Sequence, residues 1–230
     1  MSVIEDNILK IRENIAEGAL KSGRKPSEIQ LMAVTKTVDD GRILEAIEAG
    51  VDIMGENYVQ EAKRKIEKMD VNVKWHMIGY LQSNKAKYAV KLFDMIHSVD
   101  RMGLATELDK RSAAAGCVTD ILVEVNVSGE ESKSGIPADR APDLITQISM
   151  LENLSIRGLM TMPPWFDDPE DARPYFIALR KLRDEIIAEN INGVEMRELS
   201  MGMSGDYRVA VEEGATIVRI GTAIFGARVY

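Results

Sequence analysis

Short apolar segments alternate with amphipathic helical patterns along almost the whole chain, and this alternation restricts the possible folds. Eight apolar segments have the length and the flanking turn residues of buried strands: 30–36, 52–57, 74–79, 93–99, 119–127, 155–162, 196–201 and 215–221. Helical patterns lie between them, at 40–49, 57–69, 83–91, 101–115, 138–151, 169–189 and 204–213. Strands that alternate with helices pair in parallel, and eight such strands close a β/α barrel.

An open, doubly wound sheet is the alternative fold for this pattern. Such a sheet normally has a glycine-rich first turn that binds a nucleotide, but the first predicted strand ends in TKTVDDG (35–41), without a GxGxxG pattern. We therefore predict an α/β fold, a single (β/α)8 TIM barrel domain over residues 1–230. Apolar residues spaced three and four apart between 3 and 22 predict an additional N-terminal helix, within 1–25, that packs on the barrel.

The composition is that of an ordinary globular protein, with 45% hydrophobic residues, 29% charged residues and a formal net charge of -8. An acidic chain of this kind is not expected to bind nucleic acid through a broad basic face. The single cysteine, Cys117, cannot form an internal disulfide, which favours a reducing compartment. The N-terminus is acidic and lacks a continuous apolar segment, so we expect a cytoplasmic protein without membrane contact. A monomer and a weak dimer both fit this composition.

The functional residues of a β/α barrel lie where the strands end and the loops begin. Lys36 follows the apolar segment 31–34 at such an end, where desolvation would lower the lysine pKa and favour Schiff-base formation with an aldehyde. The alternative is a lysine whose stem packs on the barrel while its ammonium reaches water. Segments 200–206 and 219–226 offer glycines and hydroxyls after the last two strands, where barrels often bind phosphate, although the glycines could serve only tight turns. Together, an amine after the first strand and phosphate-binding loops after the last two strands suggest a ligand with an aldehyde and a phosphate. Pyridoxal 5'-phosphate (PLP) fits this description.

Arg219 is predicted to face the barrel interior, because strand alternation places it opposite Val218 and Ile220. A guanidinium there could donate a hydrogen bond to a pyridine nitrogen. Since the guanidinium keeps its proton, the pyridine would stay unprotonated and would be a weak electron sink. The alternative for Arg219 is an ion pair with a barrel carboxylate such as Glu124.

Other polar features are interpreted as structural. His76 and His97 are expected as hydrogen-bonded interior side chains, and their separation, without a carboxylate at ligand spacing, predicts no metal site. The segment 61–70, EAKRKIEKMD, is expected to form a solvent-exposed helix face with i,i+4 ion pairs. Lys133, in the polar loop 128–135, either is a solvated loop lysine or attracts the phosphate of arriving and leaving PLP, which is a hypothesis.

Eight segments, from about residue 30 to the C-terminus, occur together in this order: AVTKT, GENYVQEAKRKI, WHMIGYLQSNK, HSVDR, VNVSGEESKSGI, RGLMTM, LSMGMSGD and VRIGTAIFGARVY. In combination they resemble the pyridoxal phosphate homeostasis proteins, also called the YggS/PROSC family. The resemblance implies an alanine-racemase-type barrel of the fold type III PLP proteins. It also implies roles for individual residues: Lys36 as the Schiff-base lysine, Asn57 near the ring, Arg219 at the pyridine nitrogen, and Ser200, Met203, Ser204, Gly221 and Thr222 in the phosphate-binding segments.

The resemblance further implies a protein that holds PLP and buffers or delivers it, without enzymatic turnover. The similar racemases use a second acid–base group, a tyrosine from another domain, and we expect that domain to be absent because the chain ends nine residues after Gly221. We expect Tyr58, Tyr80 and Tyr207 to pack at the barrel rim rather than to replace the tyrosine of that domain. We therefore predict a PLP homeostasis protein whose partners are PLP and PLP-dependent apo-enzymes. The alternatives are a PLP-dependent enzyme, either a weak racemase or an aldolase, and a partner-binding protein that uses PLP as a sensor ligand.

Overall fold

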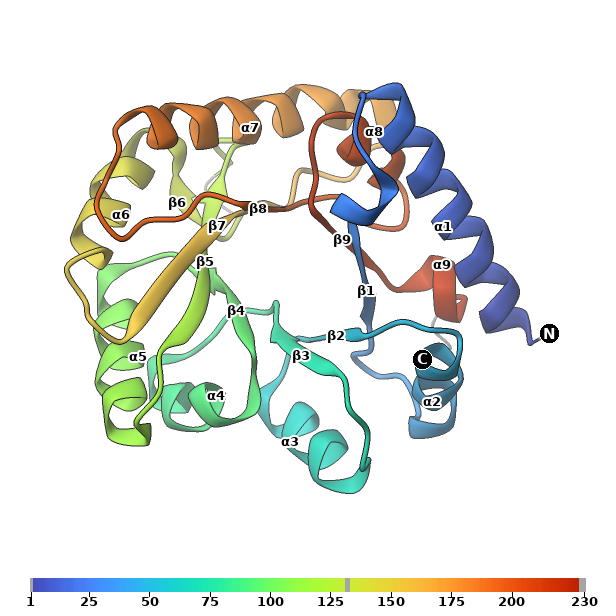
Figure 1. Ribbon diagram of the computed structural model, residues 1–230, viewed down its shortest axis with the longest axis horizontal. Helices are drawn as coiled ribbons and strands as arrows, with labels where there is room; N and C mark the ends of the chain where they lie inside the picture. The colour runs from blue at the N-terminus through green and yellow to red at the C-terminus, as the bar shows by residue number, and fades with distance from the viewer. Residues whose placement is uncertain (1, 131–132, 228–230) are drawn as a thin grey trace.

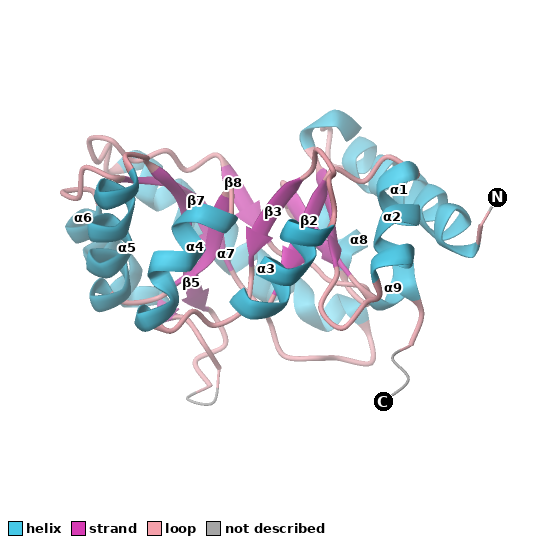
Figure 2. Cartoon of the chain, turned by 90° about the horizontal axis from the view of Figure 1, so that it is seen from below, coloured by secondary structure: helices cyan, strands magenta, loops and turns pink. Residues whose placement is uncertain are grey.

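Parallel strands close into a barrel with helices on its outside (Figure 1). The computed structural model describes residues 2–130 and 133–227. The strand order around the barrel is β1, β2, β3, β4, β5, β7, β8 and β9, and the pairings of β9 with β1 and of β4 with β5 complete the ring. Helices surround this ring in both views (Figure 2). The predicted (β/α)8 barrel is confirmed.

The barrel strands lie where the apolar segments predict them, and their bounds differ from the predicted ones by at most two residues. They are β1 Gln30–Val34, β2 Ile53–Glu56, β3 Lys74–Met77, β4 Met95–Val99, β5 Thr119–Asn126, β7 Leu154–Met160, β8 Glu198–Ser200 and β9 Ile217–Ile220. A further strand, β6 at Ile136–Pro137, pairs with the end of β5 outside the ring. It was not predicted, because two residues are too few to leave a hydrophobic pattern.

The helices follow the strands in alternation. Those after the barrel strands are α2 Asp40–Glu48, α3 Val59–Lys68, α4 Ala86–Leu92, α5 Met102–Ala115, α6 Ala141–Ile148, α7 Arg173–Ala188, α8 Tyr207–Glu212 and α9 Thr222–Phe225. Short 3-10 helices occur at Pro26–Glu28, Ser83–Lys85, Ala138–Arg140 and Pro169–Ala172. The first of the barrel helices begins after Asp39, whose side chain accepts a hydrogen bond from the N–H of Arg42 and so caps the helix.

The N-terminal helix α1, Val3–Lys21, begins with a capping box formed by Ser2 and Glu5. Its buried face consists of Ile4, Ile8, Ile11, Ile15, Gly18 and Ala19. This face packs against α8, α2 and α9, so that α1 covers the outside of the barrel near β9 and β1 (Figure 1). It thereby shields a region that the four-residue helix α9 is too short to cover. Across residues 2–130 and 133–227, neither α1 nor another helix is long and apolar enough to cross a membrane.

Apolar side chains form a large core between the strands and the helices and a small cluster inside the barrel. The inner cluster contains Met32, Ile53, Ile78 and Ile217, with Val34 and Met95 packed against it. On β9 the alternation places Ile217 inside, whereas Val218 and Ile220 belong to the outer core. Buried polar side chains, among them Arg219, Ser200 and His97, also lie in the barrel interior.

Candidate functional site

Lys36 lies in the turn that joins β1 to α2. The N–H of Thr35 donates to the carbonyl of Gly55 at 3.0 Å, which continues the pairing with β2 beyond the end of β1. The N–H of Val38 then donates to the carbonyl of Thr35 at 3.0 Å, so the chain turns directly after the strand. Within this turn Thr37 has a φ of 61°, a left-handed conformation that β-branched residues rarely adopt. Lys36 is half-buried between these two threonines.

A hollow of about 220 Å³ brings three predicted site residues together. Lys36, Gly221 and Thr222 line it, because β1 pairs with β9 and the two strands end side by side. The other residues that line this hollow are Val34, Thr37, Val38, Arg42, Phe225, Gly226 and Ala227. Lys36, after the first strand, and the loop after the last strand therefore face one space, which we call the Lys36 hollow.

Ser204 joins the loop after β8 to the loop after β9. Its Oγ accepts hydrogen bonds from the N–H groups of Gly221 at 3.3 Å and Ala223 at 3.2 Å. Met203, one residue earlier, donates its N–H to Asp206 Oδ1 at 2.6 Å, which folds the loop back on itself. The two predicted phosphate-binding segments thus meet, and the Ser204 hydroxyl lies next to the first turn of α9. A hydroxyl beside a helix start is a donor that phosphates can use.

Arg219 and Ser200 lie inside the barrel and are almost completely buried. Arg219 donates from Nη1 to Ser200 Oγ at 2.7 Å and from Nη2 to the carbonyl of Thr161 at 2.8 Å. Burial lowers the pKa of Arg219 to about 10, against the attraction of Glu124 and Asp206, so the guanidinium stays protonated at neutral pH. The predicted interior position of Arg219 is confirmed. The alternative, an ion pair with Glu124, is not formed within residues 2–130 and 133–227.

Two histidines extend the polar contacts of Arg219 through the barrel interior. Ser200 Oγ lies 3.0 Å from His97 Nδ1, and His97 Nε2 lies 3.0 Å from His76 Nδ1. Burial, helped by Lys74, lowers the pKa of His76 to about 3, and burial lowers that of His97 well below its usual range, so both rings are neutral. Because Arg219 only donates, one consistent direction runs from Arg219 through Ser200 to His97 and His76. The predicted hydrogen-bonded interior histidines are confirmed.

Glu124, on β5, is a second ionisable group inside the barrel and is only 2% exposed. Burial raises its pKa to about 7, the negative charge of Asp100 adds to the rise, and Arg219 opposes it. Near neutral pH the barrel interior therefore contains a carboxyl group that is divided between its neutral and ionised forms.

Asn57 lies in the loop after β2, next to the turn of Lys36, but it lines a different hollow of about 410 Å³. The loop after β3 approaches Asn57 closely, since a Cβ on Gly79 would lie 2.5 Å from the Asn57 carbonyl oxygen. Tyr58 and Tyr80 line the same hollow and are 60% and 58% exposed. Their exposed positions agree with the expectation that these tyrosines pack at the rim.

Tyr207, at the start of α8, is buried against α1 rather than at the rim, so the prediction for this tyrosine is wrong. Its hydroxyl accepts a hydrogen bond from Asn14 Nδ2 at 2.7 Å. The sequence could not indicate this contact, because the two residues lie far apart in the chain and meet only when α1 packs on α8.

Two cations near the site were missed in the sequence. Arg42 lines the Lys36 hollow, donates to the carbonyl of Phe225 and lies over the Phe225 ring. A signal for it was present, since an arginine in the first turn of a helix opposes the helix dipole and therefore indicates a specific partner. Lys65 is fully buried, which corrects the interpretation of 61–70 as a solvent-exposed face. Its spacing of three from Ala62 indicates that the two residues share a face of α3, but not what that face contacts.

Lys133 lies in the polar loop after β5. Lys133 is half-buried, and its N–H donates to the carbonyl of Glu130 at 3.1 Å, but a role in attracting phosphate stays a prediction. Residues 131–132 and 228–230 of the quoted motifs lie outside the described residues. In the part of the chain that the structure describes, no group of three or more histidine, cysteine, aspartate or glutamate residues is arranged to hold a metal ion.

Known proteins resemble this chain in sequence and in fold. The family of alanine racemase N-terminal domains matches residues 7–229. The pyridoxal phosphate homeostasis protein of Aquifex aeolicus is 44% identical over 226 residues, which cover 98% of both chains. The structure of PipY from Synechococcus elongatus with PLP bound is 34% identical, with a TM-score of 0.84, over 97% of this chain and 100% of that one. An alanine racemase of Clostridium difficile, 14% identical with a TM-score of 0.71 over 98% of this chain and 58% of that one, shares the fold.

Proposed function

The chain belongs to the pyridoxal phosphate homeostasis proteins, and on that premise we propose that it binds PLP through Lys36 and helps to regulate the free concentration of PLP. The observation that carries this proposal is the Lys36 hollow, because Lys36, Gly221 and Thr222 line it together. The PLP found in the structure of the relative PipY supports the choice of ligand.

The residues around the Lys36 hollow fit the chemistry of PLP. When bound, PLP would supply an aldehyde carbon, and the Lys36 amine would capture this carbon reversibly with loss of water. The hydroxyls of Ser204 and Thr222, in the loops that meet at Gly221, would hold the phosphate. Ser200 and Met203 belong to the same proposed phosphate-binding segments, although Ser200 is itself buried beside Arg219.

In this proposal Asn57 lies near the ring, and Arg219 faces the pyridine nitrogen. The guanidinium of Arg219 stays protonated at neutral pH, so it can donate to the pyridine nitrogen but cannot receive a proton for it. An unprotonated pyridine is a weak electron sink, and this supports a carrier without enzymatic turnover. The names of the relatives, which refer to homeostasis, support the same conclusion.

Reversible capture suits a carrier, because the Schiff base withholds a reactive aldehyde from stray amines and releases it to a competing amine. We propose that PLP-dependent apo-enzymes receive the ligand and that the protein acts in the cytoplasm. In this proposal residues 1–230 form one PLP-binding domain that is a monomer or a weak dimer.

Borohydride reduction after incubation with PLP tests the proposed site. The wild-type protein should turn yellow, and reduction should attach PLP to one peptide, the one that contains Lys36. Lys36→Ala should lose this modification, whereas Lys63→Ala, which changes an exposed lysine of α3, should keep it. A wild-type protein that stays colourless and takes up no PLP would overturn the proposal.

Delivery is tested by mixing the loaded protein with an apo-aminotransferase in the presence of a phosphatase that destroys free PLP. Reactivation that survives the phosphatase indicates direct transfer, whereas its loss indicates a buffer that acts through free PLP. Racemisation of alanine by the loaded protein, well above the rate with free PLP, would contradict the carrier role.

A further inference from the structure

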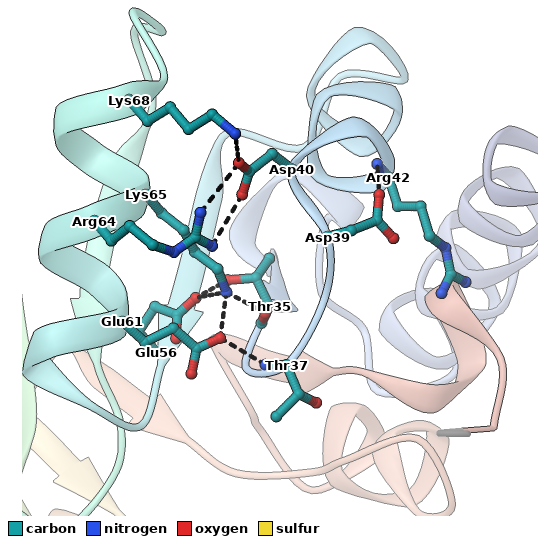
Figure 3. Close-up of polar contacts among 10 residues, drawn as sticks. All are labelled: Thr35, Thr37, Asp39, Asp40, Arg42, Glu56, Glu61, Arg64, Lys65 and Lys68. Atoms are coloured by element: carbon teal, nitrogen blue, oxygen red, sulfur yellow. Dashed lines mark hydrogen bonds and ion pairs between the residues drawn. The ribbon is translucent and has the colours of Figure 1, made fainter. Parts of the chain in front are cut away.

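A fully buried lysine lies beneath the turn that carries Lys36 (Figure 3). Lys65 extends from α3, and its Nζ lies 2.6 Å from the carbonyl oxygen of Thr35. The same atom lies 2.7 Å from Oε1 of Glu56, at the end of β2, and 2.7 Å from Oε1 of Glu61, one helical turn earlier on α3. An ammonium has three N–H donors, and here each has an acceptor. We call Lys65, Glu56, Glu61 and Thr35 the Lys65 cluster.

The Lys65 cluster is unusual in its burial. The side chains of Lys65 and Glu56 are both 0% exposed, and that of Glu61 is 22% exposed. Removing such charges from water is unfavourable, and apolar residues of the same volume often stabilise a fold equally well or better. Moreover, among residues 2–130 and 133–227, Oε2 of Glu56 is buried without a hydrogen-bond partner. Stability is therefore a weak explanation for the cluster, whereas a fixed local conformation is a use that buried ionic groups are known to have.

The cluster contacts the chain on both sides of Lys36. Before Lys36, the carbonyl of Thr35 accepts a hydrogen bond from Lys65 Nζ, and the Thr35 hydroxyl donates to Glu56 Oε1 at 2.7 Å. After Lys36, the N–H of Thr37 donates to Glu61 Oε1 at 2.7 Å. This second bond holds Thr37 in its left-handed conformation, which an isolated threonine would seldom adopt. One ammonium thus organises the carboxylates and the carbonyl that fix the two neighbours of Lys36.

From these contacts we infer that Lys65 is a positioning residue for Lys36. Its ammonium holds the turn between β1 and α2 so that the Lys36 amine is presented to the Lys36 hollow. Lys65 acts from the helix side of the sheet and is not among the residues that line the hollow. The inference rests on the proposed function, because it assigns a purpose to the conformation of a turn whose lysine captures PLP.

Capture of an aldehyde is sensitive to the placement of the attacking amine. Lys65→Met keeps an unbranched side chain that is one atom shorter, removes the ammonium and leaves Thr35, Glu56 and Glu61 without their common partner. A displacement of about 1 Å can slow a reaction about 100-fold, so we expect PLP capture in this variant to be about 10- to 100-fold slower. Pyridoxine 5'-phosphate has the same ring and phosphate but no aldehyde, and its affinity should change little.

Two further variants keep the test sharp if Lys65→Met folds poorly. Glu61→Ala removes the acceptor of the Thr37 N–H at a partly exposed position and should also slow capture, by a smaller factor. Lys63→Met is the matched control, because it removes a lysine of the same helix whose partner is the exposed Glu67. The control should capture PLP at the wild-type rate.

The measurements are the rate of absorbance change on mixing with PLP, the affinity for pyridoxine 5'-phosphate and amide hydrogen exchange in the ligand-free protein. Faster exchange at Thr37 and Val38 in Lys65→Met and Glu61→Ala, but not in Lys63→Met, supports the inference. Wild-type capture rates in both cluster variants, or equal losses of both ligands, would overturn it. Absence of capture in the wild type would overturn the proposed function instead, and the exchange data would then report on the turn alone.

Discussion

Lys65 and Arg219 are both buried cations, but they lie on opposite faces of the barrel sheet and have different partners. Lys65, between the sheet and α3, contacts the carboxylates of Glu56 and Glu61 at 2.7 Å (Figure 3). Arg219, inside the barrel, donates to the hydroxyl of Ser200 and to a backbone carbonyl. The charge of Lys65 is thus directly neutralised, whereas Arg219 is balanced only at longer range, mainly by Glu124.

This difference indicates what each cation can do. A cation whose donors are all engaged by carboxylates and a carbonyl can fix the surrounding backbone but offers little to a ligand. A cation held by neutral groups keeps much of its positive potential in a region of low dielectric, where an acceptor on a ligand is attracted strongly. Lys65 therefore suits a structural role beside the site, and Arg219 suits a contact with the ligand.

The largest expected effect is a difference in the free energy of unfolding when each of the two cations is replaced by methionine. Lys65→Met leaves two carboxylates in a buried cluster without their cation, and it should lower the free energy of unfolding by about 3–5 kcal/mol. Arg219→Met removes hydrogen bonds to neutral acceptors, so its effect should be smaller, about 1–3 kcal/mol. Urea unfolding of the ligand-free proteins measures both values. Equal losses in the two variants would show that the contrast in pairing has no energetic consequence.

A second expectation concerns Glu124, the carboxyl group that most strongly raises the pKa of Arg219. Its pKa rises from 4.5 to about 7 on folding, so between these values the folded protein binds more protons than the unfolded chain. Stability from this group is present below pH 4.5 and is lost as the pH rises through 7, by up to roughly 3 kcal/mol. Glu124→Gln should remove this loss.

The test compares urea unfolding of the wild type and Glu124→Gln at pH 5 and pH 8. The variant should gain stability relative to the wild type at pH 8, while the two proteins should differ less at pH 5. Parallel pH profiles of the two proteins would contradict the raised pKa of Glu124. They would also contradict the inference that the positive charge of Arg219 is only partly neutralised inside the barrel.

The smallest expected effect lies at the surface beside the Lys65 cluster. Asp40 accepts hydrogen bonds from Arg64 and Lys68, which hold its pKa at about 2. Asp40→Asn should lower the free energy of unfolding by only about 0.5–1 kcal/mol, because the two cations are exposed. This contribution is present above pH 4, is lost as the pH falls towards 2, and should shrink at high salt. A loss as large as that of Lys65→Met would remove the distinction between buried and exposed pairs.

The strands of this barrel were predictable because each is a short apolar segment between turn residues, and the bounds of all eight strands agree to within two residues. The helix α3 was also predictable, but the environment of one of its residues was not. Spacing along a helix shows which residues share a face, and it does not show whether a lysine on that face meets water or buried carboxylates. Lys65 was therefore taken for a surface residue.

Predictability within the site differed in the same way. Lys36, Gly221 and Thr222 were each expected at strand ends, and the pairing of β1 with β9 places them in one hollow. Ser200 was expected on the phosphate side, yet its hydroxyl contacts Arg219 and His97 inside the barrel. The side of a strand end on which a residue lies depends on the register and twist of the closed sheet, which short sequence motifs do not contain.

The sequence by itself determined the order of strands and helices, the interior position of Arg219 and the lysine at the end of the first strand. These features follow from local periodicity, which each segment carries on its own. The tertiary structure alone decided that Lys65 lies beneath the turn of Lys36 and that Tyr207 is buried under α1. Such contacts join residues from separate elements, and they exist only once the barrel closes and the helices pack on it.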